Sequence, residues 1–304
     1  MTHLVSTPKT AAALLAGVAA AGAVAGLGGA PVAGATCFSA FGLGNTAECT
    51  STIGSVAIAI GTGAAAYADG LLGAAFAFGT GSVAATVDSG IGNFAVSLGD
   101  SVSSVAGGYL SIAVAGGVNT GAAAVAFPGT ASIANIAVTL GNNDDTDVTA
   151  AGVGNVALNA FGSGSIAARG YFSTALNVGG RALVESAGLL TSATNLFGTD
   201  NIVYAADPGG TTGTASLAFS VFSNSTTVSA GPGPLAIAGS IAQTGALVTK
   251  SGPGININGL VIGGAAAVPS PAAATHQSRQ ARPGAAATKA GAPRSAAARR
   301  TAQD

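Results

Sequence analysis

Residues 54–63 read GSVAIAIGTG, and the same design returns as GAAFAFGTG at 73–81 and as GNFAVSLGD at 92–100. Each copy alternates larger apolar residues with small residues and stops at a glycine. Eight such copies end at Gly61, Gly79, Gly99, Gly117, Gly141, Gly162, Gly179 and Gly198, so the steps are 18, 20, 18, 24, 21, 17 and 19 residues. A repeat of this length is typical of units that bury their apolar side by stacking on one another.

Alternation with a period of two predicts strands with one buried face. A second, weaker strand follows each glycine, as in AAAYA (64–68) and SVAATV (82–87). Two short strands and two turns per repeat predict an all-β fold, a parallel β-solenoid of the β-roll or β-helix type, with about eight rungs of 17–24 residues over 53–204. We expect the large residues Val56, Phe94, Ile136 and Val156 to line up in one interior row.

Asparagine recurs just before the first strand of three repeats, at Asn93, Asn135 and Asn155. Glycine and asparagine both tolerate a positive φ, so this position predicts a turn. Stacked asparagine side chains can also hydrogen-bond from rung to rung.

The composition disfavours helices and a thick core. Only 7% of the residues are charged and 5% are aromatic, whereas 49% are hydrophobic, most of them small; there are 48 glycines and no tryptophan. An average protein has about 25% charged residues, so this chain has too few charges to solvate several helical surfaces. Thin, closely spaced layers fit such a sequence better.

The charge is segregated along the chain. Residues 36–264 contain ten acidic and three basic residues, which gives 3 − 10 = −7, and residues 265–304 contain six basic and one acidic residue, which gives 6 − 1 = +5. An acidic body argues against specific nucleic-acid binding by the repeats, whereas a basic tail can contact an anionic polymer or surface.

The N-terminal segment 1–35 resembles an export signal. Lys9 precedes a long apolar run that ends in Ala33-Gly34-Ala35, a small-x-small cleavage site. The alternative is a retained transmembrane helix, since the run is long enough to span a bilayer. Cleavage predicts a secreted or cell-surface protein. Contact with the membrane is expected only before cleavage, through the signal itself.

Two cysteines, Cys37 and Cys49, lie at the start of the predicted mature chain. Export favours a disulfide between them, with a metal pair or free thiols as the alternatives. We expect the disulfide to pin segment 36–52 as a cap over the first rung, because an open end would expose a strand edge.

The rhythm loosens after Tyr204. Residues 205–264 still alternate but contain Pro-Gly turns, which predicts an irregular β region or a C-terminal cap. Residues 265–304 are rich in Ala, Pro and Arg and contain one large apolar residue, Val268, so they predict a disordered basic tail.

Catalytic side chains are scarce. Both histidines, His3 and His276, fall in the signal and the tail, which leaves no histidine in the folded body for a Ser-His-Asp or Cys-His site. We therefore expect a protein that is not an enzyme and that has no organic cofactor.

An acidic cluster in the longest repeat is the main candidate for a bound ion. Asp144, Asp145 and Asp147 stand in a polar insertion, GNNDDTD, and their oxygens could bind calcium. The alternative is a solvated turn.

Two arginines near this insertion are candidate ligand-binding residues. Arg169 and Arg181 could join the aspartates in a sugar-binding or sugar-processing site. The alternatives are an exposed turn residue for Arg169 and a cross-strand pair between Arg181 and Glu185.

The repeats GSVAIAIGTGAAAYADG (54–70) and GNFAVSLGDSVSSVAGG (92–108) resemble the head repeats of YadA-like trimeric bacterial adhesins. The likeness covers roughly residues 53–190 and implies a left-handed parallel β-roll with an adhesive role. The sequence departs from that family in a period nearer nineteen residues and in having no coiled-coil stalk after the repeats. The Ala/Gly-rich body and basic tail also resemble uncharacterised secreted mycobacterial proteins, which implies a cell-envelope location.

These observations favour a noncatalytic exported solenoid with a structural or adhesive role. Its expected partners are cell-envelope polymers, host surface molecules or further copies of itself. One alternative is a polysaccharide-binding or polysaccharide-processing protein that uses the Asp144–Asp147 turn. A further alternative is an outer-membrane β protein, because alternating strands are typical of that class too.

Overall fold

The computed structural model describes residues 36–87, 90–125, 132–206 and 213–263, all of which lie in one compact unit. All regular elements in these ranges are strands, 22 in number, so the all-β prediction is confirmed. The predicted signal at 1–35 and the predicted tail at 265–304 lie outside the described residues. Within the described ranges, no helix is long and apolar enough to cross a membrane.

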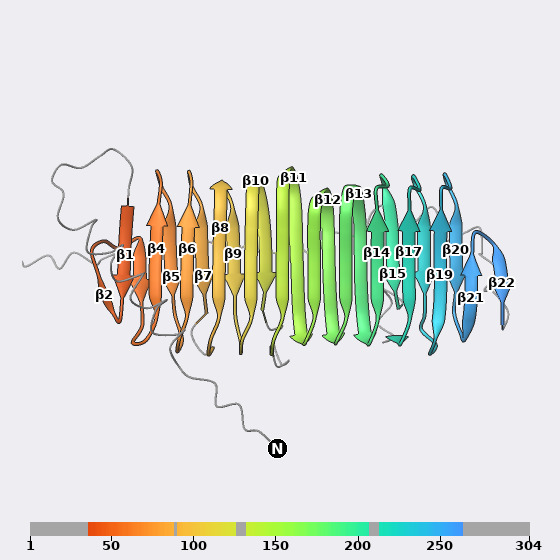
Figure 1. The fold of residues 1–304 in the computed structure, drawn as a ribbon, viewed down its shortest axis with the longest axis horizontal. Helices are drawn as coiled ribbons and strands as arrows, with labels where there is room; N and C mark the ends of the chain where they lie inside the picture. Colours follow the sequence, from red (N-terminus) through yellow and green to blue (C-terminus); the bar gives the residue numbers. More distant parts are fainter. Residues whose placement is uncertain (1–35, 88–89, 126–131, 207–212, 264–304) are drawn as a thin grey trace, which may run out of the picture. The chain divides into compact units, whose positions relative to one another are not determined.

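The strands form a parallel β-solenoid of about 11 turns, as the repeat predicts (Figure 1). Each turn contributes one segment to each of two walls. Wall A contains β4 (Val56–Ile60), β6 (Ala74–Phe78), β8 (Phe94–Asp100), the first parts of β10 (Ile112–Ala124), β11 (Ile136–Val153), β12 (Val156–Tyr171) and β13 (Thr174–Leu189), then β14 (Ser192–Leu196), β17 (Leu217–Val221), β19 (Ala236–Ile241) and β21 (Gly254–Ile257). Wall B contains β3 (Cys49–Ser51), β5 (Ala65–Ala68), β7 (Val83–Thr86), β9 (Ser103–Ala106), the second parts of β10–β13, then β15 (Asn201–Ala205), β18 (Thr227–Ala230) and β20 (Leu247–Lys250), while β16 (Gly213–Thr214) pairs with the end of β13.

The solenoid continues past residue 204, where the sequence predicts a change to an irregular region or cap. Strand β17 pairs in parallel with β14, β19 with β17, and β21 with β19. The structure therefore has more rungs than the eight expected. The added rungs are hard to recognise because Ser223 and Gln243 occupy the corner where earlier rungs have glycine, as the bridges Thr199–Asn224 and Asn224–Thr244 show.

The corner after wall A explains the glycine repeat. Gly61, Gly79, Gly99 and Gly117 have φ values of 136°, 124°, 128° and 130°, and a Cβ on Gly99 would lie 1.8 Å from the carbonyl oxygen of Gly117. No other residue fits such a close rung-to-rung approach. From β12 onward the corner changes, and β12 pairs Gly162 with Gly180, so the predicted glycine stop at Gly179 is one residue early.

The prediction of an interior row of large residues is wrong. One column does contain Phe94, Ile136 and Val156. In the register of neighbouring strands, Phe94 pairs with Ile112, Ile112 pairs with Ile136, and Ile136 pairs with Val156. The column nevertheless faces outward. The buried row consists of alanines that are all 0% exposed: Ala57, Ala75, Ala95, Ala113, Ala137, Ala157, Ala175, Ala193, Ala218 and Ala238.

The physical reason is the narrow gap between the walls. Ser97 of wall A and Ser104 of wall B are both fully buried, and their hydroxyl oxygens are 2.8 Å apart. Two short side chains therefore span the interior at this rung. A row of Val, Ile or Phe on the inner side of wall A would not fit, so alanine lies inside and the large residue lies outside.

The second inner row of wall A becomes polar in the later rungs. Asn177 donates from Nδ2 to Oδ1 of Asn159 over 2.7 Å, and Asn195 donates in the same way to Asn177 over 2.8 Å. All three side chains are at most 1% exposed. This asparagine ladder satisfies the amide groups inside the core and ties three rungs together.

The predicted asparagine column before wall A is also buried and hydrogen-bonded between rungs. Asn135 donates from Nδ2 to the carbonyl oxygen of Gly152 over 2.7 Å, and its Oδ1 accepts from the backbone N–H of Asn155 over 3.1 Å. The bonds thus run mainly to the backbone of the next rung. Positive φ values occur one residue earlier, as at Gly154 with 67°.

Strand β1 (Thr36–Ala40) and a disulfide lie at the N-terminal end of the solenoid. The disulfide between Cys37 and Cys49 is confirmed, with Cα atoms 5.6 Å apart. Strand β1 lies antiparallel to β4 and to β2 (Leu43–Gly44), with Cys37 opposite Ala59. The disulfide therefore joins the two walls at the end of the alanine core. At the other end, β22 (Leu260–Ile262) lies antiparallel to β21.

Candidate contact surface

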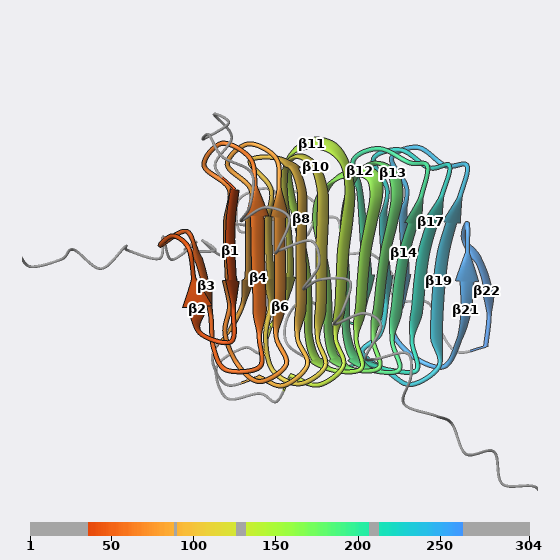
Figure 2. The same ribbon diagram turned by 60° about the vertical axis from the view of Figure 1, so that its left-hand side comes forward.

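The outer face of wall A is the most distinctive surface of the described residues. Its strands stand in one continuous row (Figure 2) and each contributes two or three outward side chains. These are Val56, Ile58, Ile60, Ala74, Phe76, Phe78, Phe94, Val96, Leu98, Ile112, Val114, Gly116, Ile136, Val138, Leu140, Val156, Leu158, Ala160, Thr174, Leu176, Val178, Ser192, Thr194, Leu196, Leu217, Phe219, Val221, Ile237, Gly239, Ile241, Ile255 and Ile257. We call this set the A face; none of its members is charged.

The A face is larger than the apolar patches of ordinary soluble proteins. Eleven wall A strands at about 4.8 Å spacing extend about 48 Å, and five residues per strand extend about 16 Å, so the face measures about 800 Å². The largest apolar patch on a typical monomer is about 300–600 Å². A continuous face of this size indicates a surface that contacts something else.

Burying the A face would leave few polar groups without partners. Its backbone N–H and C=O groups pair between rungs in the parallel ladders. Three hydroxyl side chains, Thr174, Ser192 and Thr194, are its polar members, and they lie on two neighbouring strands, β13 and β14. The desolvation penalty for covering this face is therefore small.

A ridge of large residues borders the A face on the side where wall A begins. The ridge consists of Leu72, Leu110, Phe172, Leu190 and Leu235. Each residue lies two positions before the first outward residue of its wall A strand. Their φ values lie between 54° and 57°, and each residue is 57–64% exposed. Other rungs have a small residue here, glycine at Gly92 and Gly154 and alanine at Ala134 and Ala215. The left-handed conformation costs a non-glycine residue about 1–2 kcal/mol.

These ridge residues therefore occupy positions that glycine would fill with less strain. Leu110 leans over the preceding rung, because a Cβ added to Gly92 would lie 2.9 Å from its Cδ2 atom. Backbone strain at exposed large residues is a feature that often accompanies a functional constraint on the side chain. The ridge extends the apolar surface beyond the strands themselves.

The opposite border of the A face has a similar feature in the later rungs. Phe161, Phe197 and Phe222 have φ between 50° and 55° and are exposed. The rings of Phe197 and Phe222 stack with centroids 5.5 Å apart. Both borders of the A face thus present large apolar side chains.

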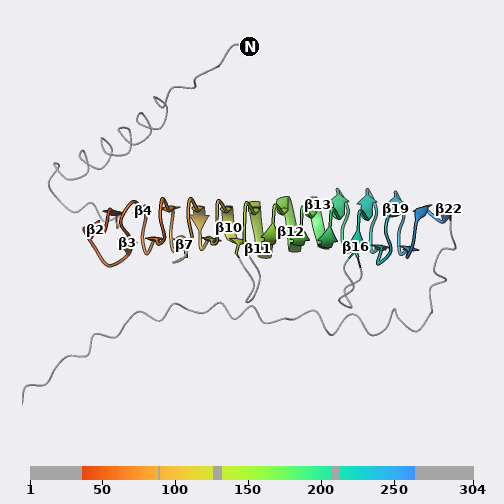
Figure 3. The ribbon, with the colours of Figure 1, turned by 90° about the horizontal axis from the view of Figure 1, so that it is seen from below.

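The outer face of wall B is mixed in character and carries charged residues. Nη1 of Arg169 and Oε1 of Glu185 form an ion pair at 2.6 Å. Tyr204 lies beside Glu185 in the register, and burial, together with the charge of Glu185, raises the pKa of Tyr204 to about 12. Figure 3, seen from below, shows the solenoid as a row of narrow coils.

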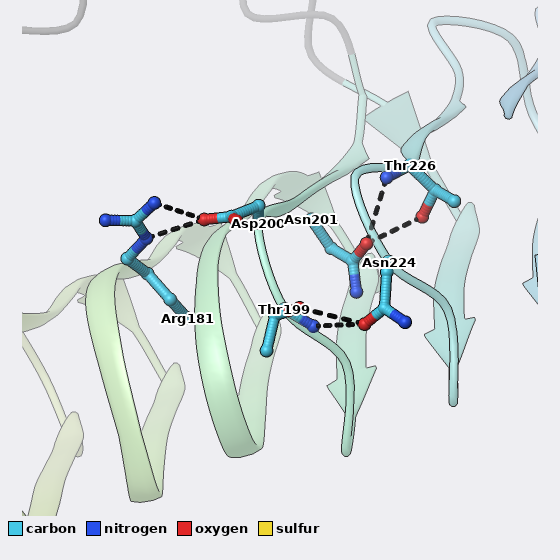
Figure 4. A network of polar contacts seen from close by, with 6 residues as sticks. All are labelled: Arg181, Thr199, Asp200, Asn201, Asn224 and Thr226. Atoms are coloured by element: carbon cyan, nitrogen blue, oxygen red, sulfur yellow. Dashed lines mark hydrogen bonds and ion pairs between the residues drawn. The ribbon is translucent and has the colours of Figure 1, made fainter. Parts of the chain in front are cut away.

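The two arginines proposed as ligand-binding residues are held in separate ion pairs. Arg181 donates from Nε to Oδ1 of Asp200 over 2.6 Å at the corner between the walls (Figure 4). The suggested pair between Arg181 and Glu185 is therefore wrong, because Glu185 pairs with Arg169 instead. Nearby, Asn224 accepts from the Thr199 hydroxyl over 2.8 Å, so this corner is held by links between rungs.

The aspartate cluster remains a prediction. Asp147 is exposed on wall B. Asp144 and Asp145 lie in β11, but their side chains are outside the described part of the structure. Among the side chains that are described, no three His, Cys, Asp or Glu residues come close enough to hold a metal ion.

The A face is not predicted from the sequence, because the alternating pattern assigns the large residues to the core. One signal was present: the first small position is alanine in all eight repeats, from Ala57 to Ala193, whereas the outward position before it varies among Val, Ala, Phe, Ile, Thr and Ser. The more restricted column was the buried one. Comparison with known proteins gives no match, whether to a family model, to a curated protein or to a solved structure.

Proposed function

We propose that this protein is a noncatalytic, exported β-solenoid that has a structural or adhesive role at the cell envelope and acts by contact through the A face. The observation that carries the proposal is the A face itself, an uncharged apolar surface of about 800 Å². The strained ridge beside it supports the same reading, since strain at exposed large residues favours a surface selected for contact.

The state of the charged residues also supports contact over chemistry. Arg169 and Glu185 neutralise each other on wall B, and Arg181 and Asp200 do so at the corner. Both pairs join neighbouring rungs. No observation favours the polysaccharide alternative strongly enough to propose it as a second function.

The proposal is tested on the purified full chain with charges placed on either wall. One variant combines Val96→Glu with Val138→Glu on the A face, and the matched control combines Thr149→Glu with Thr227→Glu on wall B, where both residues face outward. Binding to a phenyl-coated surface and to an isolated cell-envelope fraction is measured at fixed salt, and self-association is measured by sedimentation equilibrium. We expect the A-face variant to lose at least about ten-fold in at least one of these contacts, since burying an unpaired charge is strongly unfavourable.

The control should bind like the unaltered chain. Equal surface binding by all three proteins, together with equal self-association, would show that the A face is not the contact surface. Circular dichroism of each variant confirms that the strands are retained.

A further inference from the structure

We infer that the partner bound by the A face is a second copy of this chain, in a two-fold symmetric, face-to-face dimer. This inference rests on the proposed function, in which the A face is the contact surface. Two-fold dimers are the commonest soluble oligomers, and each copy contributes the same patch. The surface must therefore be compatible with itself in size, charge and shape.

The size of the A face matches a stable dimer. Two faces of about 800 Å² would together bury about 1,600 Å², which is the standard size of a specific protein–protein interface. Homodimer interfaces are also more apolar than other interfaces. The A face meets both requirements without a contribution from any other surface.

The charge and hydrogen bonding of the A face are self-compatible. None of its residues carries a charge, so two copies do not repel one another there. Its backbone groups are already paired in the ladders, so packing one face on another leaves them satisfied. Flat sheets pack at about 10 Å with their side chains interdigitated, and rows of Val, Ile, Leu and Phe suit that arrangement.

Charge argues against an anionic lipid surface as the occupant. Amphipathic surfaces that bind such lipids usually carry Lys or Arg around the apolar part. The body at residues 36–264 has the opposite balance, 3 − 10 = −7. Its three cations lie elsewhere, with Arg169 and Arg181 in ion pairs and Lys250 only 1% exposed.

The symmetry axis can be placed from the strand order. In a face-to-face dimer the two-fold axis lies in the plane between the two A faces, and complete overlap requires this axis to pass over the centre of the face. β12 is the sixth of the eleven wall A strands, and Leu158 is the middle outward residue of its wall A segment. Leu158 of one copy should therefore lie against Leu158 of the other.

The first test is the mass of the full chain in solution. Sedimentation equilibrium and light scattering should give twice the chain mass of 28.2 kDa, less the signal peptide if it is removed. Leu158→Asp should weaken association at least about 100-fold, and Thr149→Asp on wall B should leave it unchanged. A monomer across the micromolar range, or a dimer that Leu158→Asp does not weaken, would overturn the inference.

The second test does not depend on a charged variant folding. Both native cysteines are joined in a disulfide, so Leu158→Cys introduces one free thiol. Oxidation should cross-link the Leu158→Cys dimer rapidly, and the matched Thr149→Cys chain should not cross-link. Failure of Leu158→Cys to cross-link faster than Thr149→Cys would contradict the placement of the axis.

The two proposals fail in different ways. A monomer that binds phenyl surfaces or vesicles through the A face would refute the homodimer and leave the contact function standing. Preference for zwitterionic vesicles over a second copy would identify lipid as the occupant. A monomer that binds neither would refute both proposals.

Discussion

The inner and outer sides of wall A lie on the same strands and differ in one property, the size of their side chains. The inner row is alanine in ten rungs, and the outer rows are mostly Val, Ile, Leu and Phe. Hydrophobicity alone would put the larger residues inside, because they gain more from burial. The narrow interior reverses that order. In this solenoid the space between the walls decides which residues are buried.

The largest effect should come from enlarging the inner row. Ala137→Leu adds three carbons to a closed position and should lower the free energy of unfolding by about 3 kcal/mol or more, because overpacking a core forces backbone shifts. Val138→Leu, one residue later on the outer side, should change it by less than about 0.5 kcal/mol, as surface substitutions usually do. Thermal unfolding followed by circular dichroism measures both. Similar losses for the pair would refute the assignment of inside and outside.

The asparagine ladder offers a second contrast between the two sides. Asn177→Ala removes a donor to Asn159 and an acceptor for Asn195. Buried amide groups that lose their partners should lower the free energy of unfolding by about 1–3 kcal/mol. Thr194→Ala on the A face is the matched change, with an expected effect near zero, and denaturant unfolding compares the two.

A result in which Thr194→Ala is the more damaging change would show that the outer side contributes more to rung stability than the ladder does. That outcome would also weaken the view that polar groups inside this core stabilise it.

Much of the architecture can be predicted from the sequence. The glycine interval gives the coil length, because the corner at Gly99 admits no Cβ. Two cysteines, Cys37 and Cys49, behind a segment that resembles an export signal predict the disulfide that the structure shows. Which side of a wall A strand is buried cannot be predicted from that strand alone, because it depends on how closely wall B approaches. The number of rungs is hard to count from the sequence where Ser223 replaces the corner glycine. The ion pairs cannot be predicted from the sequence either, because they depend on the register between rungs.

The ridge allows a third and smaller test. Leu110→Gly should leave the free energy of unfolding within about 0.5 kcal/mol of the original value. The substitution relieves about 1–2 kcal/mol of strain from the left-handed backbone conformation. This gain offsets two losses, the greater conformational entropy of glycine in the unfolded chain and the contact that the leucine side chain makes. Ile112→Gly, two residues later in the strand, should destabilise by about 1 kcal/mol or more. Denaturant unfolding distinguishes them. Equal destabilisation by both would show that Leu110 is held in place for stability.

At neutral pH the smallest effect concerns wall B, which carries Glu185 and Tyr204 side by side. Burial and the charge of Glu185 raise the pKa of Tyr204 from 10.0 to about 12. Because the folded pKa is above the unfolded value, the associated stability is fully present below pH 10 and is lost as the pH rises towards 12. Absorbance of tyrosinate, compared with Tyr204→Phe, should locate this titration. Glu185→Gln should lower the pKa only partly, since burial is the larger cause and is unchanged.

A Tyr204 that titrates near 10 in the unaltered protein would mean that its ring is more hydrated than the rung register implies. The A face contains no titratable side chain. A rise in pH from 10 towards 12 should therefore lower stability through wall B. Contacts made by the A face should stay unchanged until the rungs themselves separate. Measuring association alongside the tyrosine titration would separate the roles of the two walls.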